Sequence, residues 1–337
     1  MSVEYRKLGK SGLRVSIPIL GCMSFGSPEW GPWVLDMDAS LPILKRAYDL
    51  GITTWDTANI YSNGESERVI AEAINRYKIP RDELVIMTKC YHVYDKTSKS
   101  PVRGDISNAR QFVNQHGLSR AAIFNQVNDS LQRLGTDYID VLQIHRYDKD
   151  VDPEEVMGAL NDLVTSGKVR YIGASSMRCY QFAMLQHVAE IHGWAKFVVM
   201  QDQYNLLYRE EEREMIPYCN LTGVGLIPWG PLAAGNLARA LNVASLRKEG
   251  MSTNEQVTDA ASIKIIERVE KLAKEKNWLM SDIALAWILE KVTSPIVGVN
   301  SIERLEQIVG VNGKSLSQED IKFLEEPYLP RQVMNHD

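Results

Sequence analysis

The chain has 337 residues, of which 45% are apolar and 24% are charged, a balance typical of a globular protein. Its formal net charge of -5 argues against a basic surface for nucleic acid or for an anionic membrane. No apolar run reaches the length of a membrane span, and the charged N-terminus lacks the apolar core of a signal peptide. We therefore expect a cytoplasmic protein without a nucleic-acid or membrane partner.

The sequence also argues against a disulfide framework and a metal site. The cysteines are widely separated and form no Cys-x-x-Cys pair, as is typical of a reducing compartment. They are Cys22, Cys90, Cys179 and Cys219. His187 and His192 fall on one predicted helix, but their spacing of five places them on different faces. We expect neither a disulfide nor a bound metal.

The predicted elements alternate between strand and helix along most of the chain. Residues 5–17 are expected to form a hairpin, because two alternating segments flank the glycine-rich turn Gly9–Gly12. Strands are then predicted at 17–20, 52–55, 84–88, 138–144, 169–173, 197–200, 225–227 and 296–298. Helices are predicted at 38–50, 65–77, 119–135, 153–166, 178–192, 209–222, 260–276, 281–291, 302–309 and 317–325.

This alternation predicts an α/β fold with parallel strands. Eight strand–helix units in about 300 residues fit a closed (β/α)8 TIM barrel with an N-terminal hairpin and extra helices. No shift in composition marks a boundary, so we expect residues 1–337 to form a single domain. Two long segments, 91–118 and 231–258, are predicted to cover the mouth at the C-terminal ends of the strands.

Four polar residues stand at or just beyond neighbouring strand ends. Asp56 and Tyr61 follow the second strand, Lys89 follows the third and His145 follows the fourth. A barrel brings these strand ends together, and an ammonium group beside a phenol lowers the pKa of the phenol. A carboxylate would hold the ammonium group, and the imidazole could orient a carbonyl or share the proton. The set predicts a tyrosine general acid for carbonyl reduction.

Each of these residues also has an ordinary structural interpretation. Tyr61 alone fits a surface turn, Lys89 a solvated strand end, and Asp56 a helix cap; His145 alone fits a hydrogen-bonded polar residue. Their coincidence at neighbouring strand ends favours a catalytic site.

Hydride for the reaction must come from a cofactor. The chain has neither a Gly-x-Gly-x-x-Gly motif nor a Tyr-x-x-x-Lys pair, so the doubly wound dinucleotide fold is disfavoured.

The sequence resembles the aldo-keto reductase family over nearly its whole length, especially its fungal aryl-alcohol dehydrogenase-like and versiconal hemiacetal acetate reductase-like branch. The resemblance is carried by Asp56–Glu67, Thr88–Lys89 and Asp137–Arg146. It implies NADPH-dependent reduction of a small aldehyde or ketone, with Tyr61 as the general acid. The implied catalytic tetrad is Asp56, Tyr61, Lys89 and His145.

The resemblance further implies that NADP(H) lies extended across the barrel mouth. Ser175, Ser176 and Gln201 would hold the nicotinamide carboxamide, and Trp229 would stack on its ring. Ser176 stands where many members have asparagine. Arg304 begins a helix and would bind the 2′-phosphate. The remaining implied contacts are Asp56, Gly21, Met23 and Ser24 near the nicotinamide, Gly230, Pro231, Leu232 and Gly235 near the pyrophosphate, and Gly298, Asn300, Ser301 and Gln307 around the adenosine.

Aromatic residues in the loops predict the character of the substrate pocket. Trp30 and Trp33 follow the first strand, and Tyr91 and His92 follow the third. With Tyr61 and His145 they would accept aromatic or polyketide-like carbonyl compounds, although the same rings could simply pack the loops. We expect a monomer or a weak oligomer.

Two other functions remain open from the sequence. One is a cofactor-binding regulatory subunit with little turnover, like the potassium-channel β subunits of the same fold. The other is a metal-dependent barrel hydrolase, which is disfavoured because only Asp56 and His145 are available as ligands at the strand ends.

Overall fold

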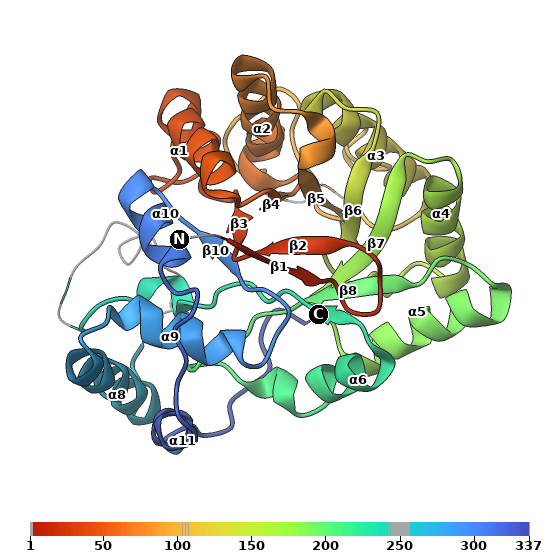
Figure 1. Cartoon of the computed structure of the whole chain (residues 1–337). Helices are drawn as coiled ribbons and strands as arrows, with labels where there is room; N and C mark the ends of the chain where they lie inside the picture. Colours follow the sequence, from red (N-terminus) through yellow and green to blue (C-terminus); the bar gives the residue numbers. More distant parts are fainter. Residues whose placement is uncertain are drawn as a thin grey trace.

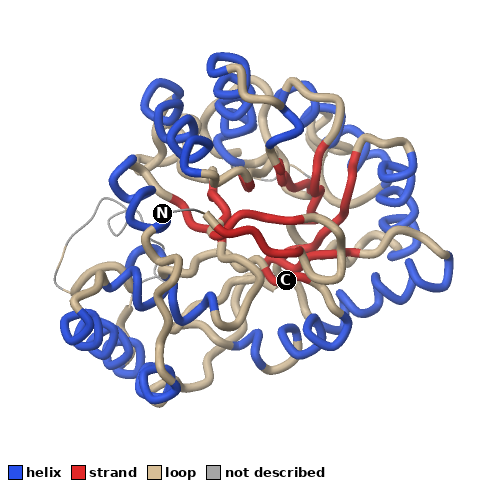
Figure 2. The backbone as a smooth tube through the Cα atoms, in the orientation of Figure 1, coloured by secondary structure: helices blue, strands red, loops and turns tan. Residues whose placement is uncertain are grey.

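A parallel eight-stranded sheet forms the centre of the molecule, and helices surround it (Figure 1; Figure 2). The computed structural model describes residues 3–102, 104, 106, 108–241, 243 and 257–336. The strand order is β10-β3-β4-β5-β6-β7-β8-β9, so neighbours in sequence are neighbours in the sheet. Ile296 N of β10 donates a hydrogen bond to Pro228 O, just after β9, at 2.9 Å, and this bond joins the two ends of the strand order. The predicted (β/α)8 barrel is confirmed.

The strand bounds agree with the predicted positions to within a few residues. The barrel strands are β3 Ile19–Gly21, β4 Thr54–Asp56, β5 Val85–Cys90, β6 Ile139–Ile144, β7 Val169–Ser175, β8 Phe197–Gln201, β9 Gly225–Leu226 and β10 Ile296–Gly298. Asp56 belongs to β4 itself, because its backbone is in register with Gly21 and Met87 on the two flanking strands. Its carboxylate is therefore placed by the sheet rather than by a loop.

Ten α-helices of the described residues cover the barrel or extend from it. They are α1 Met37–Leu50, α2 Glu65–Tyr77, α3 Arg120–Leu134, α4 Pro153–Thr165, α5 Cys179–His192, α6 Met215–Thr222, α8 Ala260–Lys276, α9 Met280–Leu289, α10 Ile302–Val309 and α11 Gln318–Glu325. Local sequence fixes their starts: Ser119 accepts a hydrogen bond from Ala122 N, and Asp152 accepts one from Glu154 N. Gly51, with φ of 91°, ends α1 in the left-handed conformation.

One predicted helix is wrong. The range 209–222 was expected to be continuous, but the chain forms a short 3-10 turn, η3 Glu210–Glu212, before α6 begins. Glu210 accepts hydrogen bonds from Tyr328 OH at 2.7 Å and from Arg331 N at 2.9 Å. These long-range bonds hold η3 against the C-terminal segment and explain why helical spacing alone did not reveal the break.

The N-terminal hairpin closes the end of the barrel remote from the strand C-termini. Its strands, β1 Glu4–Lys7 and β2 Arg14–Ile17, pair antiparallel as predicted. Ser16 N donates to Thr54 Oγ1 at 2.9 Å and Lys10 N to Gly223 O at 2.8 Å, in both cases where a barrel strand begins. An apolar cluster fills the barrel from this side, with Leu8 and Val15 of the hairpin and Ile19, Met87, Val141, Val199, Ile227 and Ile296 of the barrel.

The two long segments were predicted as loops. The described residues of 91–118 contain no α-helix or strand. In 231–258 the described part contains the short turn η4 Ala233–Gly235, while 242 and 244–256 lie outside the described residues. No helix in the described ranges is long and apolar enough to span a lipid bilayer.

Candidate active site

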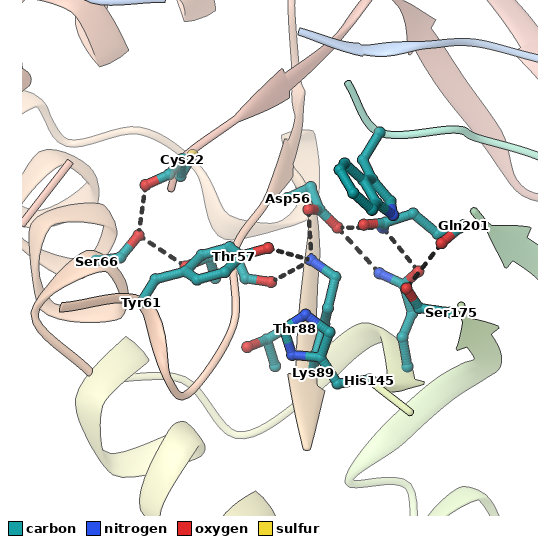
Figure 3. Close-up of polar contacts among 12 residues, drawn as sticks. Cys22, Asp56, Thr57, Tyr61, Ser66, Thr88, Lys89, His145, Ser175 and Gln201 are labelled. Atoms are coloured by element: carbon teal, nitrogen blue, oxygen red, sulfur yellow. Dashed lines mark hydrogen bonds and ion pairs between the residues drawn. The ribbon is translucent and has the colours of Figure 1, made fainter. Parts of the chain in front are cut away.

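Lys89 lies at the centre of the predicted catalytic group. Its Nζ donates to Asp56 Oδ2 at 2.6 Å, to Thr57 O at 2.9 Å and to Tyr61 OH at 3.3 Å (Figure 3). The Lys89 side chain is fully buried and that of Asp56 is 3% exposed. The structure therefore brings three of the four predicted residues into one hydrogen-bonded group.

The turn after β4 directs the Tyr61 ring toward Lys89. This turn is η1 Tyr61–Gly64, and Ser62 and Asn63 adopt left-handed conformations with φ of 50° and 51°. Ser62 Oγ accepts a hydrogen bond from Ser27 N at 3.3 Å, and Asn63 Nδ2 donates to Ser98 O at 3.0 Å. Two non-glycine residues in this strained region indicate that surrounding contacts impose the conformation, as is common at functional sites.

Burial and charge act in opposite directions on this group. Burial lowers the pKa of Lys89, but the neighbouring Asp56 and Tyr61 raise it more, so the ammonium form is favoured. Burial raises the pKa of Tyr61 and Asp56 adds to the increase, while Lys89 lowers it. The net pKa of Tyr61 is raised, contrary to the net lowering expected from the sequence. Lys89 therefore offsets only part of the increase that burial causes in the pKa of Tyr61.

His145 directly follows β6 and borders the Tyr61 ring. The two ring centres are 5.9 Å apart at an angle of 80°. Burial lowers the pKa of His145 well below its usual value, and His92, Lys89 and Arg146 lower it further. The imidazole is therefore neutral near pH 7. Its Nδ1 is buried and finds no hydrogen-bond partner among the described residues.

A buried amide network joins Asp56 to the residues expected at the nicotinamide. Asp56 Oδ1 accepts from Gln143 Nε2 at 2.9 Å and from Gln201 Nε2 at 2.9 Å. Gln201 Nε2 also donates to Gln143 Oε1 at 2.8 Å, and Ser175 Oγ donates to Gln201 O at 2.7 Å. Gln143 was missed in the sequence, although its position two residues before His145 places both on the same face of a strand.

Ser176 and Trp229 form the adjoining part of the mouth. Trp229 Nε1 donates to Ser176 Oγ at 3.2 Å, and Ser176 adopts a left-handed conformation with φ of 45°. Asp202 supports both, because its Oδ1 accepts from Ser176 N at 2.7 Å and its backbone O accepts from Trp229 N at 2.9 Å. Asp202 was not predicted; its place directly after Gln201 at a strand end was the available signal.

The residues expected at the adenosine follow β10, whose Ile296 N donates to Pro228 O, next to Trp229. Asn300 and Arg304 are exposed, and Arg304 Nη1 donates to Asn300 Oδ1 at 2.6 Å. Ser301 caps α10 by accepting from Arg304 N. Ser24 Oγ donates to Val299 O at 2.9 Å, which ties the loop after β3 to this segment.

A second arginine from the other long segment belongs to this region. Arg239 was not predicted, yet its pKa is lowered by burial and then by the charge of Arg304. Its guanidinium also packs against Gly235, where an added Cβ would lie 2.3 Å from Arg239 Nη2. The two arginines thus place positive charge in one region of the protein.

The aromatic residues of the loops surround the Tyr61 side of the mouth. Trp30 lies 6.0 Å from Trp33 and 6.5 Å from Tyr61, measured between ring centres. His92 lies 5.1 Å from Tyr91 and 4.8 Å from His145. The predicted substrate residues are thus linked to the predicted catalytic group by edge-on ring contacts.

Tyr94, a further aromatic residue of the third loop, faces elsewhere. Its hydroxyl hydrogen-bonds to Asp129 and its ring lies 4.3 Å from the Arg133 guanidinium, among buried groups. Arg133 in turn donates to Glu67 Oε2 at 2.6 Å, which fixes the start of α2 behind Tyr61. Tyr94 therefore supports the loop and does not line the mouth beside Tyr61.

The chain belongs to the aldo/keto reductase family, whose sequence model matches residues 19–328. It is 52% identical to an aldo-keto reductase of Fusarium vanettenii, over 99% of this chain and 93% of that protein. It is 54% identical to a putative aryl-alcohol dehydrogenase of Schizosaccharomyces pombe, over 97% and 96% of the two chains. It is also 49% identical to the versiconal hemiacetal acetate reductase of Aspergillus parasiticus, over 98% of each. The chain is thus an oxidoreductase of the carbonyl-reducing class, in a family that generally uses NAD(P)H.

Proposed function

We propose that this chain reduces aldehydes or ketones to alcohols with NADPH, using Tyr61 as the proton donor. The observation that carries the proposal is the position of Lys89 Nζ, within hydrogen-bond reach of both Asp56 Oδ2 and Tyr61 OH. A bound nicotinamide supplies the hydride. The chain's own residues supply the proton and hold the reacting carbonyl.

The proton donation follows from the charges of the group. As the carbonyl carbon accepts hydride, negative charge grows on its oxygen, and Tyr61 OH donates its proton there. The phenolate left behind is stabilised by the Lys89 ammonium, which Asp56 holds in place. The neutral His145 lies beside the Tyr61 ring and orients the carbonyl oxygen without competing as an acid.

The residues of the mouth fit a dinucleotide. Gln201, Ser175 and Ser176 present amide and hydroxyl groups at the ends of two adjacent strands, matching the hydrogen-bonding needs of a carboxamide. Trp229 offers an aromatic face beside them, held by its hydrogen bond to Ser176. Arg239 and Arg304 provide the positive charge that a 2′-phosphate requires, which favours NADPH over NADH.

We further propose aromatic or polyketide-like carbonyl compounds as substrates. Trp30, Trp33, Tyr91 and His92 give the pocket beside Tyr61 and His145 an aromatic wall. Flat, apolar substrates gain most from such a wall. Two of the similar proteins carry names that refer to an aryl alcohol and to versiconal hemiacetal acetate, in keeping with this class.

The experiment is a comparison of the wild type with Tyr61→Phe. NADPH consumption is followed by absorbance across matched aromatic and aliphatic aldehydes, and NADPH binding is measured separately by fluorescence. We expect aromatic aldehydes to be reduced faster, and Tyr61→Phe to lose about 10²–10⁴-fold in kcat while still binding NADPH. Equal kcat in the two proteins would exclude Tyr61 as the acid. Tight binding without turnover of any aldehyde would instead indicate a cofactor-binding regulatory subunit.

A further inference from the structure

Three potential metal ligands converge behind the Ser176 and Trp229 side of the mouth. Asp202 directly follows β8, Glu211 lies in η3 and His336 lies at the end of the described C-terminal segment. One ligand atom from each lies within 4.8 Å of the others. His336 Nε2 is 3.2 Å from Glu211 Oε1, and these two side chains are 4% and 5% exposed.

One buried carboxylate oxygen of the cluster makes a hydrogen bond of ordinary geometry with no donor among the described residues, and it shares its surroundings with a second carboxyl group, that of Glu211. Asp202 is 5% exposed; its Oδ1 accepts from Ser176 N, but its Oδ2 receives no hydrogen bond from any described residue. Buried carboxylates are normally paired with a cation or coordinate a metal.

We propose that Asp202, Glu211 and His336 form a binding site for one divalent transition-metal cation. Two carboxylates and one imidazole supply ligands that Zn²⁺ and Mn²⁺ accept, and a 2+ ion would neutralise the two acidic groups. Metal–ligand bonds of about 2.1 Å place adjacent ligand atoms about 3.0–3.4 Å apart, a range that includes the 3.2 Å between His336 Nε2 and Glu211 Oε1. The three ligand atoms lie within 4.8 Å of one another and would draw closer around a bound ion. Three protein ligands leave at least one position for water.

The site would fasten the C-terminal segment to the barrel. Besides His336, this segment is held by Met334 N, which donates to Tyr208 OH at 3.1 Å, and by Asn335 Nδ2, which donates to Gln203 Oε1 at 3.0 Å. Tyr208 OH donates in turn to Glu211 Oε1 at 3.3 Å. A metal ion would join these separate contacts into one rigid connection.

The metal would also affect the mouth through Asp202, a consequence that rests on the proposed function. Asp202 holds the left-handed Ser176 through its Oδ1 and Trp229 through its backbone oxygen. Fixing the Asp202 carboxylate from behind makes it a positioning residue for both cofactor contacts. We expect NADPH to bind several-fold more tightly to the metal-loaded protein than to the metal-free protein.

The test uses the full chain after treatment with a chelator and removal of the chelator. Calorimetric titration with Zn²⁺ alone is expected to show one ion bound per chain with Kd in the micromolar range or below. Zn²⁺ is also expected to raise the Tm. His336→Ala and Glu211→Gln should each weaken binding at least about tenfold. The matched control is His187→Ala, which removes an exposed histidine on α5 and should bind Zn²⁺ as the wild type does.

The outcomes separate this proposal from others. Without metal, Glu211→Gln should keep the wild-type Tm, because the amide oxygen of glutamine can still accept the hydrogen bond from Tyr208 OH. A wild type that binds no Zn²⁺ would overturn the proposal, as would full binding by His336→Ala. Because the titration contains no cofactor or aldehyde, its failure is independent of the proposed reductase activity. A protein that binds Zn²⁺ but lacks reductase activity would contradict the proposed reductase function and leave the proposed metal site standing.

Discussion

The two ends of the proposed cofactor path differ in how completely the chain has organised them. At the Tyr61 end, Lys89 and Asp56 are buried on adjacent strands, with their hydrogen bonds already made (Figure 3). At the other end, Arg304 begins an exposed helix and Arg239 lies in a segment of turns. There burial and then the charge of Arg304 lower the pKa of Arg239, and an anion bound beside the two guanidinium groups would oppose both effects.

This difference suggests that the buried end determines the rate of the chemical step and that the exposed end determines the affinity for the cofactor. Groups that stabilise charge in a transition state must be in place beforehand, and a sheet fixes them better than a loop. Groups that recognise a phosphate can gain their order on binding. We therefore expect substitutions at the buried end to lower kcat and stability, and substitutions at the exposed end to change KM for the cofactor.

The largest expected effect comes from Lys89→Met. The substitution removes the cation that stabilises a Tyr61 phenolate and leaves the Asp56 carboxylate buried without its ion-pair partner. We expect kcat to fall by about 10²–10⁴-fold. The free energy of unfolding should fall by about 3–5 kcal/mol, the usual cost of breaking a buried pair. Steady-state kinetics and urea unfolding measure the two effects.

Lys45→Met is the matched control for charge and size. Lys45 pairs with Asp49 one helical turn away, at side-chain exposures of 37% and 39%. Such an exposed pair contributes about 0.3–0.5 kcal/mol, and the substitution should leave kcat unchanged. If Lys89→Met proved as mild as Lys45→Met, the buried pair would not be the centre of the site.

Gln143→Leu tests whether the buried end extends beyond the predicted tetrad. The change removes one donor to Asp56 Oδ1 and the acceptor of Gln201 Nε2. We expect kcat to fall about tenfold, because Asp56 and Gln201 both lose the hydrogen bond that they make with Gln143. Gln143→Glu should also lower kcat, since a second carboxylate would face Asp56. Unchanged kcat in both variants, measured with saturating cofactor, would contradict a positioning role.

The sequence indicated which residues meet at the buried end better than which residues meet at the exposed end, for physical reasons. Asp56, Lys89 and His145 stand at strand ends, and strand ends follow from the alternation of apolar runs. Their partners Gln143 and Asp202 lie at the same ends, but nothing in the spacing shows which amide meets which carboxylate. The net pKa of Tyr61 was misjudged because burial outweighs one neighbouring charge, and burial of a loop residue is a tertiary property.

Arg239 shows a different reason for a missed residue. It lies in a turn-rich segment without hydrophobic periodicity, and its neighbour Arg304 is 65 positions further along the chain. Only the fold brings the two segments together, since each follows a different strand of the closed barrel. The same holds for His336, whose approach to η3 depends on the break that divides the predicted helix 209–222.

Arg239→Ala and Arg304→Ala test the exposed end. Each substitution should raise KM for NADPH about tenfold, because a charge-assisted contact to the 2′-phosphate is lost, and should leave kcat within twofold of the wild type. KM for NADH should not change. Arg46→Ala is the control, because Arg46 pairs with Glu306 on α10 at 2.6 Å and should affect neither cofactor. A parallel rise of KM for NADH would contradict the 2′-phosphate assignment.

The smallest effect concerns the charge state of His145. Burial lowers its pKa in the folded chain below the usual 6.5, so the unfolded chain binds a proton first as the pH falls. Stability conferred by this neutral imidazole is complete above about pH 6.5 and is lost below it, by at most about 1.4 kcal/mol per pH unit. His145→Asn should therefore lose less unfolding free energy than the wild type between pH 6.5 and pH 5. Identical pH dependence of the unfolding free energy in the two proteins would show that burial does not lower the pKa of His145. The buried end would then be more accessible to water than its geometry indicates.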